Sequence, residues 1–296
     1  MKIGVIHYRT RLSETTRELI EAIEKLGHRS IYIKIHELDS YIDNGLIRVK
    51  RFNEDIDIDG GIIRSLGLYL TIDSFMKRIG VLEALSTFST IINKPEAIVY
   101  TRDKWRSLLK LVRNGISVPD TLLTENPFSA MRFCEKQSVS VYKPLIGSLG
   151  LGSTLVNDPD IAYHLTRSLL NIGLPSYYQV FLNKPGYDFR VFVVGNDVIG
   201  AMKRVIASGW KTNIAQGARG IGINCSEYSE VCDIAIKATR ILDLDYAGVD
   251  IAYDNNTNKY YVLEVNAFPQ WIGLRTATGV DVAKHIVQYL IDKIKR

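Results

Sequence analysis

The chain has 296 residues, of which 46% are hydrophobic and 23% are charged, and its formal net charge is +5. This length is enough for about two domains of ordinary size, each with its own core. No apolar run approaches the roughly 18 to 20 residues that span a bilayer, and the first six residues read as a strand rather than a signal peptide. We therefore expect a cytoplasmic protein without a membrane partner. The mild positive charge suits anionic ligands or an acidic partner but falls short of a nucleic-acid-binding signature.

The cysteines indicate no metal site. Cys134, Cys225 and Cys232 are odd in number, and they lack the paired spacing of zinc-binding motifs. We expect all three to be reduced, structural thiols.

The N-terminal part of the chain alternates between strand-like and helix-like segments, which is the pattern of a parallel sheet with crossover helices. Thr15 and Glu18 form a candidate capping box for the first helix. Residues 8–11 follow the first strand in place of a glycine fingerprint, so we do not expect a dinucleotide site there. The predicted strands and helices of this part are residues 2–7, 15–26, 30–35, 61–64, 72–85 and 90–93.

The rest of the chain mixes helices with a strand-rich region. Strands are expected at residues 138–143 and throughout 177–206, where Gly195, Asn196 and Asp197 form a hairpin turn. The predicted helices of this part are residues 101–114, 160–171, 228–242, 280–295 and one that starts at Pro127.

Two acidic segments near the C-terminus form a candidate metal site. Asp250 lies in one apolar, β-branched run, and Glu264 and Asn266 lie in the next, with the turn-forming residues 254–258 between them. Adjacent antiparallel strands would bring the three side chains together, because Glu264 and Asn266 are two residues apart and share one sheet face. Such oxygen ligands suit Mg²⁺ held against phosphates. The alternative is an ordinary hairpin with solvated carboxylates.

A glycine-rich loop follows the strand that ends at Lys143. It contains Gly147, Gly150 and Gly152, and such loops can lay backbone N–H groups against phosphate oxygens. It is not a Walker loop, because the Gly-Lys-Ser/Thr ending is missing. The ammonium groups of Lys143 and Lys104 could meet the phosphates. Considered without the other motifs, the loop could equally be an ordinary β-hairpin. Each lysine, considered alone, could be a solvated surface group.

Taken in order, these motifs resemble those of the ATP-grasp superfamily, and within it the ribosomal-protein-S6-modification-like (RimK-like) amino-acid ligases. The resemblance implies an α/β chain of the α+β ATP-grasp type. A small parallel-sheet pre-grasp domain would occupy residues 1–94, a central subdomain with a glycine-rich lid 95–175, and a C-terminal subdomain with the Mg²⁺ site 176–296. The matching segments are residues 101–104, 142–152, 178–182, 188–192, 202–204, 211–213, 247–250 and 264–266.

The resemblance also implies a role for each matching residue. Lys104 and Lys143 would neutralise the α- and β-phosphates of ATP beneath the glycine loop. Asp188 would face the ribose, and Arg190 and Arg204 would act on the γ-phosphate and the acyl-phosphate. If the motifs did not occur in the family's order, the two arginines would be interpreted as a cross-strand surface pair, and residues 179–182, the candidate adenine-binding hinge, as a buried strand. The remaining implied residues are Gln179, Val180, Phe181 and Leu182 for the hinge, Lys211, Thr212 and Asn213 for nucleotide and substrate, and Asp250, Glu264 and Asn266 for one or two Mg²⁺ ions, which Mn²⁺ can replace.

The reaction implied by the resemblance is ATP-dependent amide formation. A carboxylate first takes the γ-phosphoryl group of ATP, a transfer that needs positive charge around the phosphate oxygens. An amine then attacks the acyl-phosphate and expels phosphate. Because water would destroy this intermediate, we expect the glycine loop to close over the site.

Two departures from the family pattern bear on the acceptor. Gln216 stands where many relatives have arginine, and residues 267–274, including Gln270 and Trp271, replace the usual Ala-Ser-Pro-Gly. Both segments are similar to archaeal ligases that add L-glutamate to the tails of tetrahydromethanopterin or the deazaflavin F420. Trp271 could stack on an acceptor ring or pack in the core.

Other functions stay open at this point. The same scaffold serves ligases of lysine and arginine biosynthesis, which join an amino acid to the C-terminal glutamate of an acidic carrier protein, and ligases that glutamylate ribosomal protein S6. A catalytically inactive nucleotide-binding regulator is the non-enzyme alternative, which the full set of motif residues disfavours. The resemblance also allows a homodimer or a homotetramer, because the family often forms dimers or tetramers, and the sequence leaves the oligomeric state open.

Overall fold

The computed structural model describes residues 1–67, 70–147, 151–206, 209–210 and 217–296. Within these ranges, no helix is both long and apolar enough to cross a membrane. Several residues with predicted roles lie outside the described residues, so their roles stay predictions. They are Gly150, Lys211, Thr212, Asn213 and Gln216.

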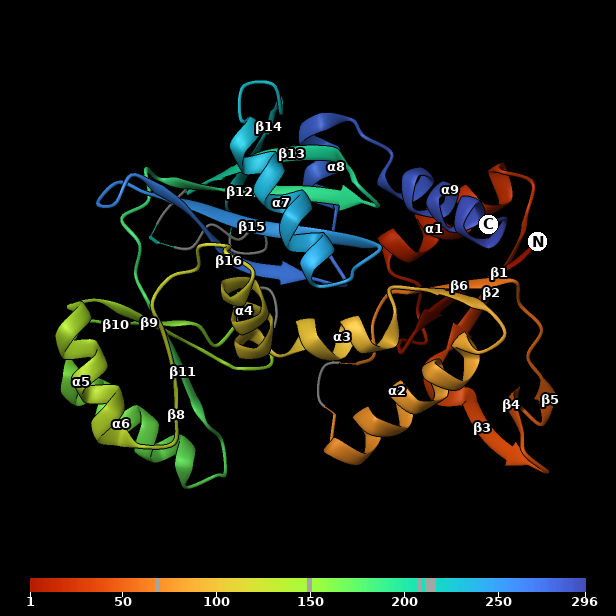
Figure 1. Ribbon diagram of the computed structural model, residues 1–296, viewed down its shortest axis with the longest axis horizontal. Helices are drawn as coiled ribbons and strands as arrows, with labels where there is room; N and C mark the ends of the chain where they lie inside the picture. Colours follow the sequence, from red (N-terminus) through yellow and green to blue (C-terminus); the bar gives the residue numbers. More distant parts are fainter. Residues whose placement is uncertain (68–69, 148–150, 207–208, 211–216) are drawn as a thin grey trace.

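A parallel four-stranded sheet forms the N-terminal part, with strand order β2-β1-β6-β7 (Figure 1). The residues of β1 pair in parallel with β2 on one side and with β6 on the other. Ile3 and Val5 of β1 are fully buried, as expected for a parallel sheet. The predicted βαβ start is therefore confirmed. The elements are β1 (Lys2–His7), α1 (Glu14–Lys25), β2 (Arg29–Lys34), β6 (Gly60–Ile63), α2 (Ile72–Ser86) and β7 (Thr90–Ile92).

The predicted capping box of α1 is wrong. Ser13 is the N-cap, and its side chain accepts a hydrogen bond from the backbone N–H of Thr16. Glu18 instead accepts a hydrogen bond from Nε1 of Trp271 at 2.5 Å. The distant partner of Glu18 explains the error, because it cannot be read from the local sequence.

A small antiparallel sheet at residues 38–55 was not predicted. It consists of β3 (Leu38–Asp43), β4 (Leu46–Arg51) and β5 (Glu54–Asp55). Leu38 and Val49 are the buried residues in these strands, and most of the others are exposed. Because so few side chains are buried, the segment carries no clear hydrophobic periodicity.

The single helix predicted at residues 101–114 is two helices. α3 (Pro95–Arg102) ends before Asp103, which has an extended backbone, and α4 (Lys104–Arg113) follows it directly. The Asp103 side chain caps α4 by accepting a hydrogen bond from the backbone N–H of Arg106 at 3.1 Å. The break makes Lys104 the first residue of a helix.

An antiparallel sheet of order β10-β9-β11-β8 forms the next layer, with α5 and α6 beside it in Figure 1. Ala130 and Ala162 of the helices share a buried cluster with Tyr178 of β11. β11 pairs with β8 and β9, so this sheet extends past the proposed boundary at residue 175. The elements are β8 (Thr121–Thr124), α5 (Pro127–Gln137), β9 (Ser140–Lys143), β10 (Thr154–Val156), α6 (Pro159–Leu170) and β11 (Ser176–Val180).

A five-stranded antiparallel sheet of order β14-β13-β12-β15-β16 forms the third layer. α7 packs against it, whereas α9 returns to the N-terminal part and lies beside α1 (Figure 1). Val287 and Leu290 of α9 share a buried cluster with Ile3 and Val5 of β1. The elements are β12 (Tyr187–Val194), β13 (Asp197–Val205), β14 (Arg219–Ile223), α7 (Ser229–Ile241), β15 (Tyr246–Asp254), β16 (Lys259–Asn266), α8 (Ile272–Thr278) and α9 (Val282–Ile294).

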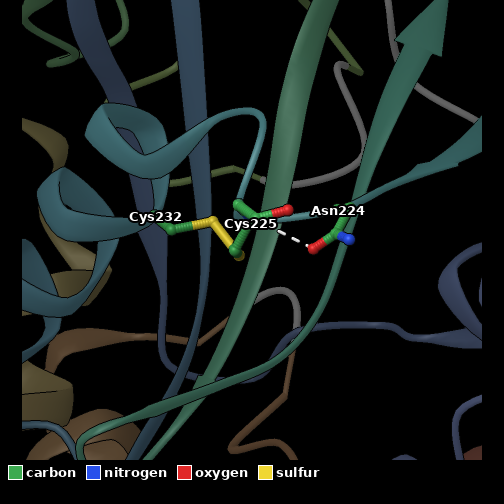
Figure 2. The surroundings of a disulfide bond; sticks show 4 residues. Asn224, Cys225 and Cys232 are labelled. Carbon is green, nitrogen blue, oxygen red and sulfur yellow. Dashed lines mark hydrogen bonds between the residues drawn. A yellow bond between two sulfur atoms is a disulfide. The ribbon is translucent and has the colours of Figure 1, made fainter.

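Cys225 and Cys232 form a disulfide, which corrects the expectation that all three cysteines are reduced. Figure 2 shows the bond joining the segment after β14 to α7, beside a hydrogen bond from the backbone N–H of Ser226 to Asn224. Cys134 is free and buried, as expected. The pairing depends on the tight connection between β14 and α7, which the spacing of the cysteines does not reveal.

Removing the disulfide is expected to lower the free energy of unfolding by about 2 to 3 kcal/mol, the chain-entropy estimate for so short a loop. Urea denaturation of wild-type protein and of the double variant Cys225→Ser, Cys232→Ser measures the difference. A reducing agent should lower the stability of the wild type to that of the variant and leave the variant unchanged. Equal stability of the oxidised wild type and the variant would contradict this expectation.

Candidate active site

Charged side chains form a row across the centre of the five-stranded sheet. Arg190 of β12 lies opposite Asp250 of β15, and Asp250 lies opposite Glu264 of β16. Asp188, two residues before Arg190 on β12, lies opposite Arg204 of β13. Because residues two apart on a strand share a face, all five side chains lie on one face of the sheet. The predicted meeting of the acidic segments on adjacent antiparallel strands is confirmed.

Buried ion pairs connect the members of this row. Arg204 donates from Nε and Nη2 to the two carboxylate oxygens of Asp188, at 2.7 and 2.8 Å. Its Nη2 also lies 3.2 Å from Oδ2 of Asp250, and Nε of Arg190 lies 2.6 Å from Oδ1 of Asp250. Burial opposes the charge of Arg204, but Asp188 and Asp250 outweigh it and raise its pKa. The site therefore holds two fixed guanidinium groups near the candidate metal ligands, while the ribose contact of Asp188 stays a prediction.

Gly248 lets Arg190 approach the sheet closely. A Cβ atom at this position would lie 2.5 Å from Nη1 of Arg190 and 2.7 Å from Cβ of Pro269. Both distances are too short for non-bonded atoms, so any other residue would displace one of these neighbours. Gly248 thus sets the position of Arg190 against the chain segment that leaves β16.

The three predicted metal ligands fit Mg²⁺. Oδ1 of Asp250 is buried and makes no hydrogen bond within the described chain, although Arg190 lies within ion-pair distance. Asn266 turns its amide nitrogen towards the carbonyl of Gly248, at 3.3 Å, so its oxygen faces the other way. The described residues contain no cluster of three or more His, Cys, Asp or Glu side chains suited to a metal. Two carboxylates and an amide are instead the set expected for Mg²⁺ that shares its coordination with phosphates.

Lys104 and Lys143 face the same cleft from the neighbouring elements. Nζ of Lys104 donates to the carbonyl oxygens of Pro144 at 3.0 Å and of Gly147 at 3.2 Å. Gly152 has a φ of +75°, a conformation that glycine adopts readily. The glycine-rich loop is therefore held at its described ends by Lys104 and by a glycine turn.

Lys143 is bound to the adenine-hinge candidate. At the end of β9, it donates a hydrogen bond to Oε1 of Gln179 on β11. Burial lowers the pKa of Lys143 to about 8, with Glu264 acting in the opposite direction. Gln179 is itself buried, and its Nε2 donates to Thr121 at 3.2 Å.

One cleft collects most of the predicted residues. It holds about 850 Å³ of space, part of it open to solvent. Arg190, Gly152 and Asn266 are not among its lining residues. The predicted residues that do line it are Lys104, Lys143, Gly147, Gln179, Val180, Phe181, Leu182, Asp188, Arg204, Asp250 and Glu264.

Lys184 and Trp210 also line this cleft and were not predicted. Burial lowers the pKa of Lys184, while Asp188 acts to raise it. The Trp210 ring lies edge-on to Phe181, with the ring centres 6.1 Å apart. Lys184 precedes Pro185 and Gly186, and this pattern is typical of an exposed turn, so nothing in the sequence indicated its place in the cleft. Trp210 directly precedes the predicted nucleotide-binding segment 211–213, and this position could have indicated its role.

The two acceptor candidates after β16 behave differently. Trp271 is fully buried, with Arg64 over its ring and Phe192 against its edge. Stacking on an acceptor ring is therefore unavailable to Trp271, and the alternative of core packing is the arrangement found. Gln270 is exposed and accepts a long hydrogen bond of 3.4 Å from Thr15.

Asn93 joins both metal-site strands and was not predicted to do so. Its Nδ2 donates to the carbonyl of Tyr246 at 3.0 Å and to that of Ala267 at 2.8 Å. Its Oδ1 accepts from the backbone N–H groups of Asp245 at 2.7 Å and Tyr246 at 3.0 Å. Asn93 is fully buried, so it fixes the start of β15 relative to the end of β16.

Comparison with known proteins relates this site to a family. The RimK-like ATP-grasp domain matches residues 101–290. The chain belongs to the RimK-like ATP-grasp family. It is 30% identical over 304 aligned residues to the tetrahydromethanopterin:alpha-L-glutamate ligase of Methanocaldococcus jannaschii, and the match covers 100% of both chains. The probable alpha-L-glutamate ligase of Haemophilus influenzae is 33% identical over 202 residues, or 67% of this chain and 66% of that protein.

Solved structures of RimK-like and other ATP-grasp ligases share the fold. The ATP-grasp ligase PsnB, solved with a phosphomimetic variant of its minimal precursor, Mg and ADP, superposes with a TM-score of 0.77 at 22% identity, covering 99% of this chain and 98% of that chain. A RimK domain protein of Sphaerobacter thermophilus gives a TM-score of 0.72 at 18% identity, covering 98% and 99%. The predicted α+β ATP-grasp fold and the expected class of enzyme, an ATP-grasp amino-acid ligase, are confirmed.

Proposed function

We propose that this protein adds L-glutamate to the carboxylate tail of a small cofactor such as tetrahydromethanopterin, using ATP and an acyl-phosphate intermediate. The observation that carries the proposal is that Asp250 and Glu264 line one cleft together with Lys104, Lys143 and Arg204. Such an arrangement surrounds a polyphosphate with both cations and metal ligands. The full-length match to the Methanocaldococcus jannaschii enzyme supports the choice of acceptor.

The protein's part in the reaction is to bind and orient charged groups. Lys104 and Lys143 hold the α- and β-phosphates of ATP, and the backbone of the hinge, residues 179–182, contacts the edge of the adenine. Arg190 and Arg204 stabilise the negative charge that builds up as the γ-phosphoryl group passes to the acceptor carboxylate. The two guanidinium groups are already held by Asp188 and Asp250, so they need little rearrangement.

Asp250, Glu264 and Asn266 would hold Mg²⁺ at this site. When bound, Mg²⁺ supplies charge neutralisation at the β- and γ-phosphates. In the second step, the amine of glutamate attacks the acyl-phosphate carbon, the bond from carbon to the bridging oxygen breaks, and inorganic phosphate leaves. A closed cleft that excludes water favours the amine over hydrolysis.

The domain limits 1–94, 95–175 and 176–296 are part of this proposal. β11 joins the central sheet, and α9 packs on the N-terminal part, so the units are joined by shared strands and a shared core. The nucleotide would lie between the central sheet and the five-stranded sheet, whose residues line the cleft together.

An acceptor screen tests the proposed function. Purified protein with ATP, Mg²⁺ and L-glutamate is offered tetrahydromethanopterin, a deazaflavin acceptor, an acidic carrier protein with a C-terminal glutamate, and ribosomal protein S6. We expect mass spectrometry to show added glutamate on tetrahydromethanopterin. If only one of the other acceptors is glutamylated, that acceptor replaces tetrahydromethanopterin in the proposal. If no acceptor supports ADP formation, the proposed function is rejected.

The variant Lys143→Ala is expected to weaken ATP binding roughly tenfold to a hundredfold, the range for one charge-assisted contact to a phosphate. Isothermal titration calorimetry measures the affinity. Lys136→Ala is the matched control, because Lys136 is exposed on α5 near the same sheet. Wild-type affinity in the Lys143 variant would remove this lysine from the nucleotide site.

A further inference from the structure

Arg64 occupies a position at which parallel sheets commonly bind ligands. It directly follows β6, and its backbone N–H donates to the carbonyl of Ile6 at 2.8 Å. It therefore lies at the carboxyl end of the sheet, next to His7 at the end of β1. The chain forms β2 on one side of β1 before it forms β6 on the other. Ligands of open α/β sheets bind outside the carboxyl ends of the strands at such a reversal of strand order.

The guanidinium group of Arg64 is buried, and no carboxylate among the described residues pairs with it. Nη2 donates to the carbonyl of Pro269 at 2.9 Å, whereas Nε and Nη1 make no hydrogen bond within the described residues. Burial lowers the pKa of Arg64, and the group that opposes this is the hydroxyl of Tyr246 rather than a carboxylate. The Trp271 ring, 4.2 Å from the guanidinium carbon, offsets part of the cost. Nε and Nη1 still lack an acceptor in good hydrogen-bond geometry within the described residues, although the Tyr246 hydroxyl interacts with the guanidinium group. An anion would supply such acceptors.

Neighbouring groups add positive potential at this edge. Burial of the ring, with the buried Arg64 and the exposed Arg9 acting in the same direction, lowers the pKa of His7 to about 4, so the ring is neutral at physiological pH. Nδ1 of His7 accepts a hydrogen bond from the backbone N–H of Arg9 at 2.9 Å. The proton of the neutral ring is therefore on Nε2, which makes His7 a further hydrogen-bond donor.

A short chain of contacts connects Arg64 to the catalytic arginine. Arg64 binds the carbonyl of Pro269, and Pro269 and Arg190 both pack against the same face of Gly248. Pro269 follows Asn266 by three residues. Pro269 therefore lies between Arg64 and Arg190, in contact with the first and close to the second.

We propose that Arg64 forms, with His7, a subsite for a second carboxylate of the acceptor, so that the enzyme selects acceptors whose tails carry two carboxylates. This inference rests on the function proposed above, because it takes the group activated beside Arg190 to be the acceptor's other carboxylate. Nε and Nη1 are covered by protein, so the side chains over them must shift to admit the ligand. The 3.4 Å hydrogen bond between Thr15 and the exposed Gln270 is the longest described contact between α1 and residues 267–274, which makes Gln270 the expected point of entry.

Calorimetry with small carboxylates tests the subsite without any turnover. Protein saturated with ADP and Mg²⁺ is titrated with succinate, glutarate and adipate, and with the monocarboxylate valerate. We expect at least one dicarboxylate to bind wild-type protein about tenfold or more tightly than valerate, as one charge-assisted contact predicts. Arg64→Gln should abolish this preference and leave valerate binding unchanged, and Arg64→Lys should retain part of it.

Arg29→Gln is the matched control, because Arg29 is exposed at the start of β2, at the opposite end of the same sheet. It should keep the wild-type preference. If wild-type protein does not prefer any dicarboxylate over valerate, the subsite proposal is overturned. This outcome is measured on the wild type alone, so it does not depend on whether a variant folds. A preference that persists in Arg64→Gln would also overturn it. Failure of ADP and Mg²⁺ to bind would instead count against the proposed function, so the two outcomes are distinguishable.

Discussion

The variant Glu264→Gln is expected to form ADP roughly a thousandfold more slowly than wild-type protein, because a metal at a phosphoryl group contributes several kcal/mol to transition-state stabilisation. Glutamine keeps the size of the side chain but removes the charge. Within the described residues Glu264 makes no hydrogen bond or ion pair, so the change should leave the fold intact. A coupled assay for ADP measures the rate as a function of Mg²⁺ concentration.

Glu21→Gln is the matched control for this variant. Glu21 is exposed on α1, far from the row of charged residues in sequence, and its replacement should leave the rate unchanged. Circular dichroism and thermal unfolding should be the same for both variants and the wild type. Turnover by Glu264→Gln at the wild-type rate would refute the metal-site assignment.

Asn93→Ala is expected to have the largest effect on stability, a loss of about 2 to 4 kcal/mol in the free energy of unfolding. The change removes four buried hydrogen bonds and leaves the backbone groups of Asp245, Tyr246 and Ala267 without their partner. Because these groups belong to the start of β15 and the end of β16, the spacing of the metal ligands should loosen as well. We expect the Mg²⁺ concentration needed for half-maximal activity to rise.

Urea denaturation and Mg²⁺ titration of activity measure the two effects of Asn93→Ala. The control is Asn157→Ala, an exposed asparagine between β10 and α6, which should change neither quantity. Asn93→Asp provides a second test, because it keeps an acceptor for the two N–H groups but loses both donated hydrogen bonds. Because its second carboxylate oxygen would face the carbonyls of Tyr246 and Ala267 at a buried position, its stability should fall at least as far as that of Asn93→Ala.

The parts of the site that depend on strand periodicity could be predicted from the sequence. Glu264 and Asn266 are two residues apart, and the turn before them makes antiparallel pairing with the strand of Asp250 the simplest arrangement. The structure has this pairing, with a bulge directly after Asp250. Lys143 likewise stands at the end of its predicted strand, where the cleft begins.

The features that could not be predicted depend on distant partners. Asn93 bonds to residues more than 150 positions away, and Trp271 is buried against Arg64 and Glu18 of the N-terminal part. Local patterns hold no signal for such contacts. The break at Asp103 has a local cause instead, because the Asp103 side chain caps the second helix within an apparently continuous helical pattern.

The proposed acyl-phosphate intermediate is tested directly by following one oxygen atom. An acceptor whose reacting carboxylate is labelled with heavy oxygen is incubated with the protein, ATP, Mg²⁺ and L-glutamate, and the released phosphate is analysed by mass spectrometry. If the carboxylate is activated as an acyl-phosphate, one labelled oxygen enters phosphate for each amide formed. Amide formation with unlabelled phosphate would contradict the proposed mechanism.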